Sequence, residues 1–474
     1  MNFTEFSFWW ILGSFLIPFL VIRQVFVFGG LWREEFDRKA LMLLSLTLFW
    51  NAAASSFLIF IVELAVNYAV VRWITTHDRA VASKFLGYFT IGLDLTILAY
   101  FKYLDFLAEN LLSPFIGDDL SPGAVANIPP GISFYTFQMI AFLVDTLKGK
   151  RQGAPSFIDY VNFASFFPQI VAGPIERRAD LLPQAQQFRF TLTSENLDRG
   201  LRWLVFGFFM KFVLADNLSP FVLMENTGNA WIIWFSALLF GFRIYFDFAG
   251  YSFIGLGIAQ MLGVRLTVNF LAPYAAVSLT DFWRRWHITL SGWFRDYVYM
   301  PLGGSRSGWV KANIMVVFCV SGLWHGAGWN FILWGSYHGV LMVFLRKTER
   351  FAVRLPSWVT KISTFGLVTM GWLLFMDQDF GRIELKVETI CTPASYCLTG
   401  VTQLLQEFSI VDRGVLFVSL LLTGVVFVLE FIGSARNVQK PYELLLSTWP
   451  VRVMLILTVL CSASSPSDFV YFAF

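Results

Sequence analysis

The stretch VLFVSLLLTGVVFVLEF at residues 415–431 decides the class of fold, because it contains a single charged residue. Comparable apolar runs occupy residues 41–66, 85–101, 231–246, 314–323 and 331–345. A bilayer span needs roughly 20 apolar residues, and the hydrocarbon core admits only helices or closed barrels. These continuous runs lack the alternation of a barrel strand. We therefore predict an all-α polytopic membrane protein with about 11 to 13 membrane-spanning or re-entrant helices.

The composition agrees with a membrane protein. The chain has 474 residues, of which 57% are hydrophobic, and its mean hydropathy is +0.62. A formal net charge of +3 is too small to indicate binding to nucleic acid, and the basic residues fall in loops. We expect membrane lipid as a partner and no nucleic acid. No fixed-period repeat or soluble domain is visible, so we predict one membrane-embedded domain over residues 1–474.

Basic residues predict the topology. The N-terminus begins MNFTEF and lacks the basic start of a secretory signal, so the first apolar run is expected to be a membrane helix. The positive-inside rule places the loop 29–40 and a second basic loop, 346–361, in the cytoplasm. The polar stretches 113–130, 174–200 and 377–398 are expected to be loops or short amphipathic elements. Cys391 and Cys397 could form a disulfide if their loop faces an oxidising compartment.

Polar residues inside the apolar region 131–345 mark the part of the chain expected to carry function. They include Glu176 and Asp247, and such residues are costly at membrane depth unless they face protein or a wet cavity. We therefore predict that residues 131–345 form the catalytic core region. Neither pair of cysteines, Cys319 with Cys461 or Cys391 with Cys397, has metal-ligand spacing with a histidine, so no metal site is predicted.

The sequence DFWRRWHITLSGWFRD at residues 281–296 concentrates charges and aromatic rings. Read as a helix, it places Asp281 and Arg285 four residues apart, and Arg284 and His287 three residues apart. Trp283 and its neighbouring tryptophans give the helix an apolar face. An interfacial helix would also explain this pattern, with arginines reaching lipid headgroups and tryptophans in an aromatic belt. That alternative gives His287 no purpose.

The sequence VSGLWHGAGWNFILWGSYHG at residues 320–339 places His325 beside Trp324 in an apolar run. Its small residues allow another helix or a ligand to approach the backbone closely. A membrane histidine often serves only in packing, but histidine is also the side chain best able to accept a proton near pH 7. Three of the four histidines fall within residues 287–338, which favours a functional role.

Several longer blocks resemble the membrane-bound O-acyltransferase family. They are GISFYTFQMIAFLVD at 131–145, FFPQIVAGPIER at 166–177, KFVLADNL at 211–218, YFDFAGYSFIGLGIAQMLG at 245–263, NFLAPYAAVSLTDFWRRWHITLSGWFRDYVYMPLGG at 269–304 and SGLWHGAGWNFILWGSYHG at 321–339. With the closing DFVYFAF, they are most similar to the bacterial alginate O-acetyltransferase branch. The resemblance covers most of the chain from about residue 95 onward.

The resemblance implies helices that surround a reaction tunnel in the bacterial inner membrane. An acetyl group would pass from cytoplasmic acetyl-CoA towards hydroxyls of an exported, alginate-type polysaccharide. The histidine of the LWHG block, regarded as catalytic in this family, corresponds to His325, and the residue that ends FWRRWH corresponds to His287. No permanently bound cofactor is implied, and a periplasmic partner is expected to complete the transfer.

The predicted site follows from this chemistry. A hydroxyl attacks a thioester poorly until a base removes its proton, and His325 is the expected base. His287 would orient the substrates, and tryptophan Nε1 groups, Asn330 or His287 would stabilise the oxyanion. The guanidinium groups are expected to receive the phosphates of coenzyme A. The predicted tunnel residues are Asp281, Trp283, Arg284, Arg285, Arg295, Trp324 and Asn330, with supporting residues His338, Asp247 and Glu176.

Two alternatives remain open at the level of sequence. A transporter or polysaccharide conduit would also place Asp, Arg and His in the membrane, but it predicts inverted repeats, and none is visible. Transfer of D-alanine from a carrier protein is the second alternative. The YMPLGGSR continuation at residues 299–306 favours the polysaccharide acetylation branch over the D-alanine branch.

Overall fold

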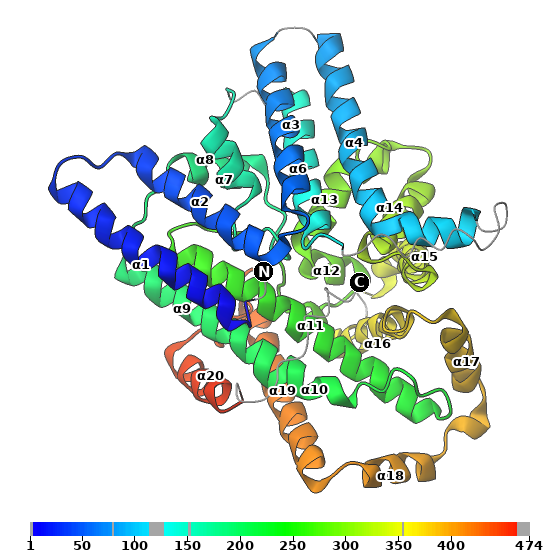
Figure 1. Ribbon diagram of the computed structural model, residues 1–474. Helices are drawn as coiled ribbons and strands as arrows, with labels where there is room; N and C mark the ends of the chain where they lie inside the picture. Colours follow the sequence, from blue (N-terminus) through cyan, green and yellow to red (C-terminus); the bar gives the residue numbers. More distant parts are fainter. Residues whose placement is uncertain (1–2, 78–79, 113–127, 150–152, 353–354, 462–474) are drawn as a thin grey trace. The chain divides into compact units, whose positions relative to one another are not determined.

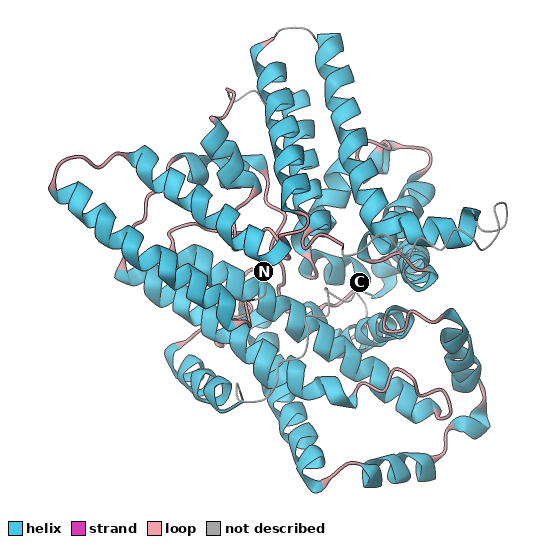
Figure 2. Cartoon of the chain, in the orientation of Figure 1, coloured by secondary structure: helices cyan, strands magenta, loops and turns pink. Residues whose placement is uncertain are grey.

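The computed structural model describes residues 3–77, 80–112, 128–149, 153–352 and 355–461 (Figure 1). Regular structure in these ranges is helical, and they contain no strand (Figure 2). The closing stretch 468–474 and most of the predicted loop 113–130 lie outside the described residues. The prediction of an all-α protein is confirmed for the part that is described.

The helices follow one another along the chain, and η denotes a 3-10 or π segment. Their bounds are α1 Phe6–Phe28, α2 Glu34–Ala53, α3 Phe57–Thr76, α4 Ala80–Leu107, η1 Ala108–Leu112, α6 Ile132–Leu147, α7 Phe157–Ala164, α8 Arg178–Gln186, α9 Ser194–Phe208, η2 Phe209–Ala215, α10 Asp216–Leu218, η3 Ser219–Phe221, α11 Ala230–Met261, η4 Pro273–Ala275, α12 Leu279–Arg285, α13 Ile288–Phe294, η5 Arg295–Tyr299, η6 Gly304–Arg306, α14 Val310–His325, α15 Trp329–Ala352, α16 Ser357–Phe375, α17 Phe380–Cys391, η7 Pro393–Ser395, α18 Leu398–Glu407, α19 Ile410–Arg436 and α20 Thr448–Cys461.

The lengths of these helices make the protein a multi-pass membrane protein. Within the described ranges, seven helical segments are long and apolar enough to cross a bilayer. They are α1, α3, α4 with η1, α9 continued to Phe221, α11, α16 and α19. The described residues also contain four shorter apolar helices, α6, α14, α15 and α20. Together with the seven long helices, they reach the lower end of the predicted range of membrane-spanning or re-entrant helices.

The apolar run 415–431 lies inside α19. Leu, Val and Phe dominate the helix, and Ser409 caps its start: the Ser409 hydroxyl accepts a hydrogen bond from the backbone N–H of Asp412, while the Asp412 carboxylate accepts one from the backbone of Ser409. This reciprocal capping satisfies two donors that the first turn would otherwise leave unpaired. The apolar run 41–66, by contrast, is divided between α2 and α3 by a turn at residues 54–56.

Two predicted segments differ from the structure. The basic segment 346–361 is expected to be a loop, but α15 continues to Ala352 and α16 begins at Ser357. The conditional disulfide is not formed, because Cys391 and Cys397 are free thiols. The stretches 174–200 and 377–398 do contain the expected short helices, namely α8, the start of α9, and α17.

The described chain divides into two compact units. The first contains residues 1–204 and 254–267, and the second contains residues 205–253 and 268–474. The prediction of a single domain stays a prediction. In the first unit, α3 and α4 lie side by side (Figure 1). Ion pairs tie its α1, α2 and α7 together: Arg23 contacts Asp37 at 2.9 Å, and Arg38 contacts Asp159 at 2.7 Å.

The second unit contains α12 to α20 and both predicted catalytic histidines. α17 and α18 connect α16 to α19 along its edge (Figure 1). Its interior is rich in aromatic side chains, among which Trp334, Tyr245 and Phe246 are fully buried. The candidate site lies within this aromatic core.

Candidate active site

His287 lies at a break between two helices. The predicted single helix over residues 281–296 is wrong, because α12 ends at Arg285 and α13 begins at Ile288. His287 has φ of +42°, a left-handed conformation that side chains other than glycine rarely adopt. The predicted spacing between Arg284 and His287 on one helical face is therefore wrong as well. Such a strained residue is held by its surroundings and is typical of functional sites.

Contacts from a distant segment hold this break. The backbone N–H of Ile288 donates to the carbonyl of Asn269 at 3.0 Å, and that of Leu271 donates to the carbonyl of Arg285 at 3.0 Å. The side-chain oxygen of Asn269 accepts from the hydroxyl of Thr289 at 2.7 Å. Residues 269–271 therefore fix the backbone on both sides of His287.

The imidazole of His287 is buried among aromatic rings. It packs against Phe248 with ring centroids 4.7 Å apart and against Trp324 at 5.7 Å. This burial lowers the pKa of His287 to about 3. At neutral pH the ring is therefore uncharged, with one nitrogen as a donor and the other as an acceptor.

His325 is the last residue of α14, which packs against α15 through glycines. A Cβ atom on Gly322 would lie 2.2 Å from the carbonyl oxygen of Phe331, and one on Gly335 would lie 3.3 Å from the Cα atom of Gly322. The two backbones thus approach as closely as small residues allow. The expectation that small residues in this stretch permit close approach is confirmed at Gly322.

Aromatic rings surround His325. The imidazole packs edge-on against Trp334 at 5.1 Å, Phe375 at 5.4 Å and Trp324 at 5.1 Å between ring centroids. Trp372 lies behind Trp334, with centroids 6.2 Å apart. His325 is 4% exposed, so the base expected from sequence lies in an apolar enclosure.

Tryptophans separate the three histidines of this region. Trp324 lies between His287 and His325, whereas Trp334 lies between His325 and His338, at 5.0 Å from the latter. The Nε1 atom of Trp334 is buried and has no hydrogen-bond partner among the described residues. It is therefore a donor that the described part of the fold leaves unused.

Asn330, Trp283 and His338 complete the aromatic cluster. The side-chain amide of Asn330 donates to the carbonyl of Phe375 at 3.4 Å, which links α15 to α16. Trp283 packs against His338 at 5.1 Å and Trp334 at 5.8 Å between ring centroids. Asn330, Trp334 and His338 follow one another at intervals of four on α15.

The arginines of the opening cluster have different environments. Arg285 is buried, and its guanidinium contacts Asp281 at 2.9 Å and the hydroxyl of Ser434 at 2.8 Å. Arg284 is exposed. Arg295 is exposed and pairs with Asp296 at 2.8 Å. The predicted Asp281–Arg285 pair is therefore present, and the guanidinium of Arg285 is engaged by partners within the fold.

Asp247 belongs to a buried ion network in the second unit. The ammonium of Lys211 contacts Asp247 at 2.7 Å and Asp216 at 2.9 Å. Lys211 lies on the π segment η2, where the wider turn shifts the side chain relative to an α-helix. Asp247 thus neutralises a basic neighbour.

Glu176 belongs to the first unit, apart from the two histidines in the sequence and in the division into units. Its carboxylate accepts from the backbone N–H of Thr267 at 2.6 Å and from the Thr267 hydroxyl at 3.1 Å. Burial raises the pKa of Glu176 to about 7, although these hydrogen bonds oppose the shift. The residue thus holds the loop at Thr267.

Three of the predicted residues pack against Trp334, namely His325, His338 and Trp283. Trp324 packs against His325, and Asn330 donates to the carbonyl of Phe375. Sequence reasoning missed Trp334 and Phe375. The interval of four between Asn330, Trp334 and His338 could have identified Trp334. In the described part of the chain, no group of three or more His, Cys, Asp or Glu residues could hold a metal ion.

A sequence profile described as MBOAT, membrane-bound O-acyltransferase family, matches residues 43–376. The chain belongs to the membrane-bound O-acyltransferase family. This match includes both histidines and the helices that surround them. The resemblance inferred from the WRRWH and LWHG blocks is therefore confirmed.

Curated relatives include acetyltransferases and a D-alanyltransferase. The chain is 37% identical over 306 residues to a probable alginate O-acetylase of Azotobacter vinelandii, covering 61% of this chain and 60% of the relative. It is 34% identical over 329 residues to a peptidoglycan O-acetyltransferase of Helicobacter pylori, covering 62% of each. A teichoic acid D-alanyltransferase of Bacillus subtilis is 30% identical over 276 residues, covering 53% of this chain and 69% of the relative. The chain thus spans about three fifths of the length of the first of these family members.

Proposed function

We propose that this protein is a membrane O-acetyltransferase of the bacterial inner membrane. It takes an acetyl group from cytoplasmic acetyl-CoA and passes it across the membrane towards hydroxyls of an exported, alginate-type polysaccharide. The observation that carries the proposal is the position of His325. Its buried imidazole lies at the end of α14 and packs against Trp334, whose Nε1 atom has no hydrogen-bond partner among the described residues. The similarity to a probable alginate O-acetylase favours acetyl transfer to an alginate-type acceptor.

The reaction follows from the chemistry of the imidazole. An acceptor hydroxyl loses its proton to His325 as its oxygen attacks the carbonyl carbon of the acetyl thioester. The C–O bond forms, the C–S bond breaks, and the imidazolium returns the proton to the departing thiolate. The products are an acetyl ester and coenzyme A. The surrounding rings exclude water, which would otherwise hydrolyse the thioester.

The negative charge that develops on the carbonyl oxygen needs a fixed donor. The indole of Trp334 packs against His325, and its buried Nε1 atom has no hydrogen-bond partner among the described residues. A preorganised donor in a dry site stabilises an oxyanion more strongly than water does. Asn330 is less suited, because one of its two amide N–H donors is engaged by the carbonyl of Phe375. We therefore assign the oxyanion contact to Trp334.

His287 and the exposed arginines take supporting roles. Since burial keeps His287 uncharged, it can orient a substrate through one donor and one acceptor nitrogen. Arg284 and Arg295 are the exposed guanidinium groups of the cluster and suit the phosphates of coenzyme A. Arg285 is engaged by Asp281 and Ser434, and its role is to hold α12.

The acceptor side is expected to need a periplasmic partner that completes transfer to the polysaccharide. No permanently bound cofactor is required, because acetyl-CoA supplies the acyl group. A second candidate function is D-alanyl transfer from a carrier protein, favoured by the similarity to the teichoic acid D-alanyltransferase of Bacillus subtilis. A membrane conduit without catalysis would give His325 no catalytic role.

Turnover of acetyl-CoA by the purified protein in nanodiscs tests the proposal. Release of free coenzyme A, or transfer of labelled acetyl to an alginate-type acceptor, is expected for the wild type and not for His325→Ala. Each variant is first checked by thermal melting. Binding of a D-alanyl carrier without acetyl-CoA turnover would favour the second candidate. If the protein turns over neither acetyl-CoA nor the D-alanyl carrier, the result would favour a membrane conduit.

A further inference from the structure

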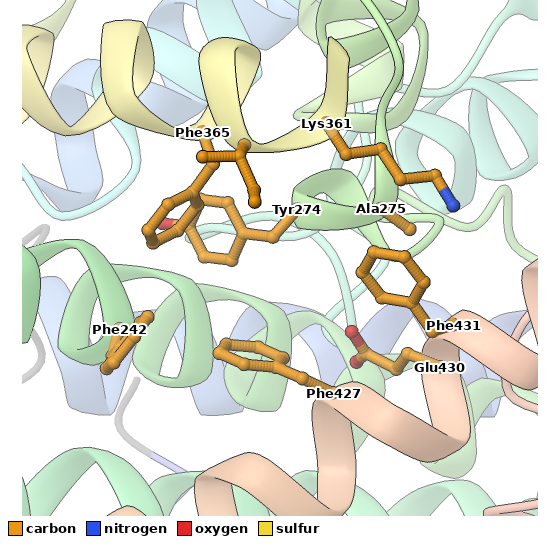
Figure 3. A pocket seen from close by; sticks show the side chains of 9 residues that line it. Phe242, Tyr274, Ala275, Lys361, Phe365, Phe427, Glu430 and Phe431 are labelled. Atoms are coloured by element: carbon orange, nitrogen blue, oxygen red, sulfur yellow. The ribbon is translucent and has the colours of Figure 1, made fainter. Parts of the chain in front are cut away.

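A cavity of about 270 Å³ lies between α11, η4, α16 and α19 (Figure 3). Its lining includes neither His325 nor His287, so it is distinct from the candidate active site. Aromatic rings form most of the wall, and two charged side chains complete it. The lining residues are Phe242, Tyr274, Ala275, Lys361, Ile362, Phe365, Phe427, Glu430 and Phe431.

The cavity opens where a phospholipid headgroup would lie. α11, α16 and α19 are each long and apolar enough to cross a bilayer. Lys361 is within the first turns of α16, which begins at Ser357, and Glu430 and Phe431 are within the last turns of α19. The 19 residues of α16 span about 28 Å at 1.5 Å per residue, so its first turns lie near the membrane surface. Ile362 and Phe431 are exposed, which places the opening on the outside of these helices.

The polar and apolar parts of the cavity are separated. Figure 3 shows Lys361, Glu430 and Phe431 at one end, and Phe242, Tyr274 and Phe365 towards the other. An amphiphile needs this division, with charged partners for its headgroup and rings for its chain.

Lys361 supplies a cation for a phosphate. Its ammonium lies 4.1 Å from the ring centroid of Phe431. Lys361 makes no salt bridge with a carboxylate in the described ranges, and nearby Asp281 is paired with Arg285. An ammonium near the membrane surface is a suitable partner for a lipid phosphate.

Glu430 supplies an acceptor for a cation. Its side chain is 2% exposed, and one carboxylate oxygen accepts from the hydroxyl of Tyr245 at 2.7 Å. No other hydrogen bond reaches this carboxylate from the described chain, so its second oxygen is available at the cavity wall. The rings of Phe427 and Phe431 flank it, and aromatic faces attract ammonium groups.

We propose that this cavity binds a phospholipid with an ethanolamine headgroup, whose phosphate contacts Lys361 and whose ammonium contacts Glu430. One acyl chain lies against Phe242, Tyr274 and Phe365. An anionic lipid such as phosphatidylglycerol offers the phosphate but no cation for Glu430, so it binds more weakly. The site does not depend on the proposed function.

Native mass spectrometry of the full chain, delipidated in detergent and titrated with single lipids, tests this site. Wild type is expected to bind one phosphatidylethanolamine at least tenfold more tightly than phosphatidylglycerol with the same chains. Lys361→Gln weakens both lipids about tenfold, because both carry phosphate. Glu430→Gln keeps the acceptor for Tyr245 and removes only the preference between the lipids.

Lys311→Gln is the matched control, because Lys311 is exposed in the first turn of the apolar helix α14 but lines no part of this cavity. It should leave both affinities unchanged. Equal binding of the two lipids by the wild type, or equal losses in Lys311→Gln and Lys361→Gln, would overturn the proposal. If the variants do not fold, phosphatidylcholine supplies the test in the wild type. Its trimethylammonium cannot donate to Glu430 and should bind more weakly than ethanolamine.

Discussion

The indole of Trp334 lies edge-on against the imidazole of His325, with ring centroids 5.1 Å apart and ring planes at 87°. The same indole packs against His338 at 5.0 Å on α15. Both histidines are at least 96% buried and share this neighbour. Substituting each histidine in turn therefore distinguishes a catalytic role from a role in packing.

Substitution of His325 is expected to remove activity, whereas substitution of His338 is not. His325→Gln should lower the rate of acetyl transfer by about 100-fold or more, since general base catalysis contributes about 10² to 10⁴. His338→Gln should change the melting temperature by a similar amount but retain the rate within about threefold of wild type, because it removes no base. Rates and melting temperatures of both variants check this. Comparable loss of rate in both would mean that packing around Trp334 controls activity.

Trp334 allows a test of the oxyanion contact. Trp334→Phe keeps a ring beside His325 but removes the Nε1 donor. Loss of one such donor typically lowers kcat by about 10² to 10³, with little change in KM. Trp372→Phe is the control, because the Nε1 atom of Trp372 donates to the hydroxyl of Tyr274 at 3.1 Å and is already used inside the fold. A kcat loss confined to Trp372→Phe would rule out the assignment to Trp334.

His287 is expected to make folding sensitive to acid. Burial lowers the pKa of His287 to about 3, whereas the ordinary pKa is about 6.5. Between these values the unfolded chain binds more protons than the folded protein, so stability decreases as the pH falls below about 6.5. The contribution at pH 5 is about 2 kcal/mol, from about 1.4 kcal/mol per pH unit.

His287→Asn should reduce this loss, and Asn tolerates the left-handed backbone at this position. Thermal melting at pH 7 and pH 5 measures the effect, and the difference between the two pH values should be smaller in the variant. His77→Asn, at an exposed position, should behave like the wild type. An unchanged pH dependence in His287→Asn would show that His287 is protonated without cost.

The break at His287 illustrates what the sequence could not reveal. Composition and apolar runs predict membrane helices, because the bilayer imposes their length and polarity. The spacing of Asp281 and Arg285 also predicts their pair, since the helix determines that contact locally. The break between α12 and α13 depends instead on hydrogen bonds that Asn269 accepts from Ile288 and Thr289, and Asn269 lies 18 residues before His287 in the sequence. Helical periodicity contains no information about such a distant partner.

Residues around His325 show the same division. Gly322 was correctly predicted to permit close helix packing, because small residues have few other uses inside an apolar run. Phe375 lies 50 positions from His325, and one phenylalanine among 53 in the chain has no distinguishing local signal. Tertiary packing alone selects it.

The contact of α14 with α15 is expected to be intolerant of a methyl group. In Gly322→Ala the new Cβ atom would lie 2.2 Å from the carbonyl oxygen of Phe331, so the helices must separate. Overpacking of this kind costs about 1 to 3 kcal/mol. Gly424→Ala in α19 has no heavy atom within 4 Å and should be neutral or stabilising by up to about 1 kcal/mol. Thermal melting compares the two variants, and equal melting temperatures would contradict the close packing.

Exposure separates the roles of the three arginines. Arg284 and Arg295 are exposed, whereas Arg285 is buried against Asp281 and Ser434. Arg284→Gln and Arg295→Gln should each raise the KM for acetyl-CoA about tenfold, since a hydrogen bond to a charged group contributes about 1.5 to 3 kcal/mol.

Arg285→Gln should instead lower the melting temperature, because it leaves Asp281 without its partner. Steady-state kinetics with acetyl-CoA and with a truncated acetyl thioester that lacks the nucleotide phosphates separate binding from folding. The rise in KM should vanish with the truncated donor for Arg284→Gln and Arg295→Gln, because no nucleotide phosphate remains to be bound. A rise that persists with the truncated donor would place these guanidinium groups elsewhere on the substrate path, and the phosphates of coenzyme A would then need another partner.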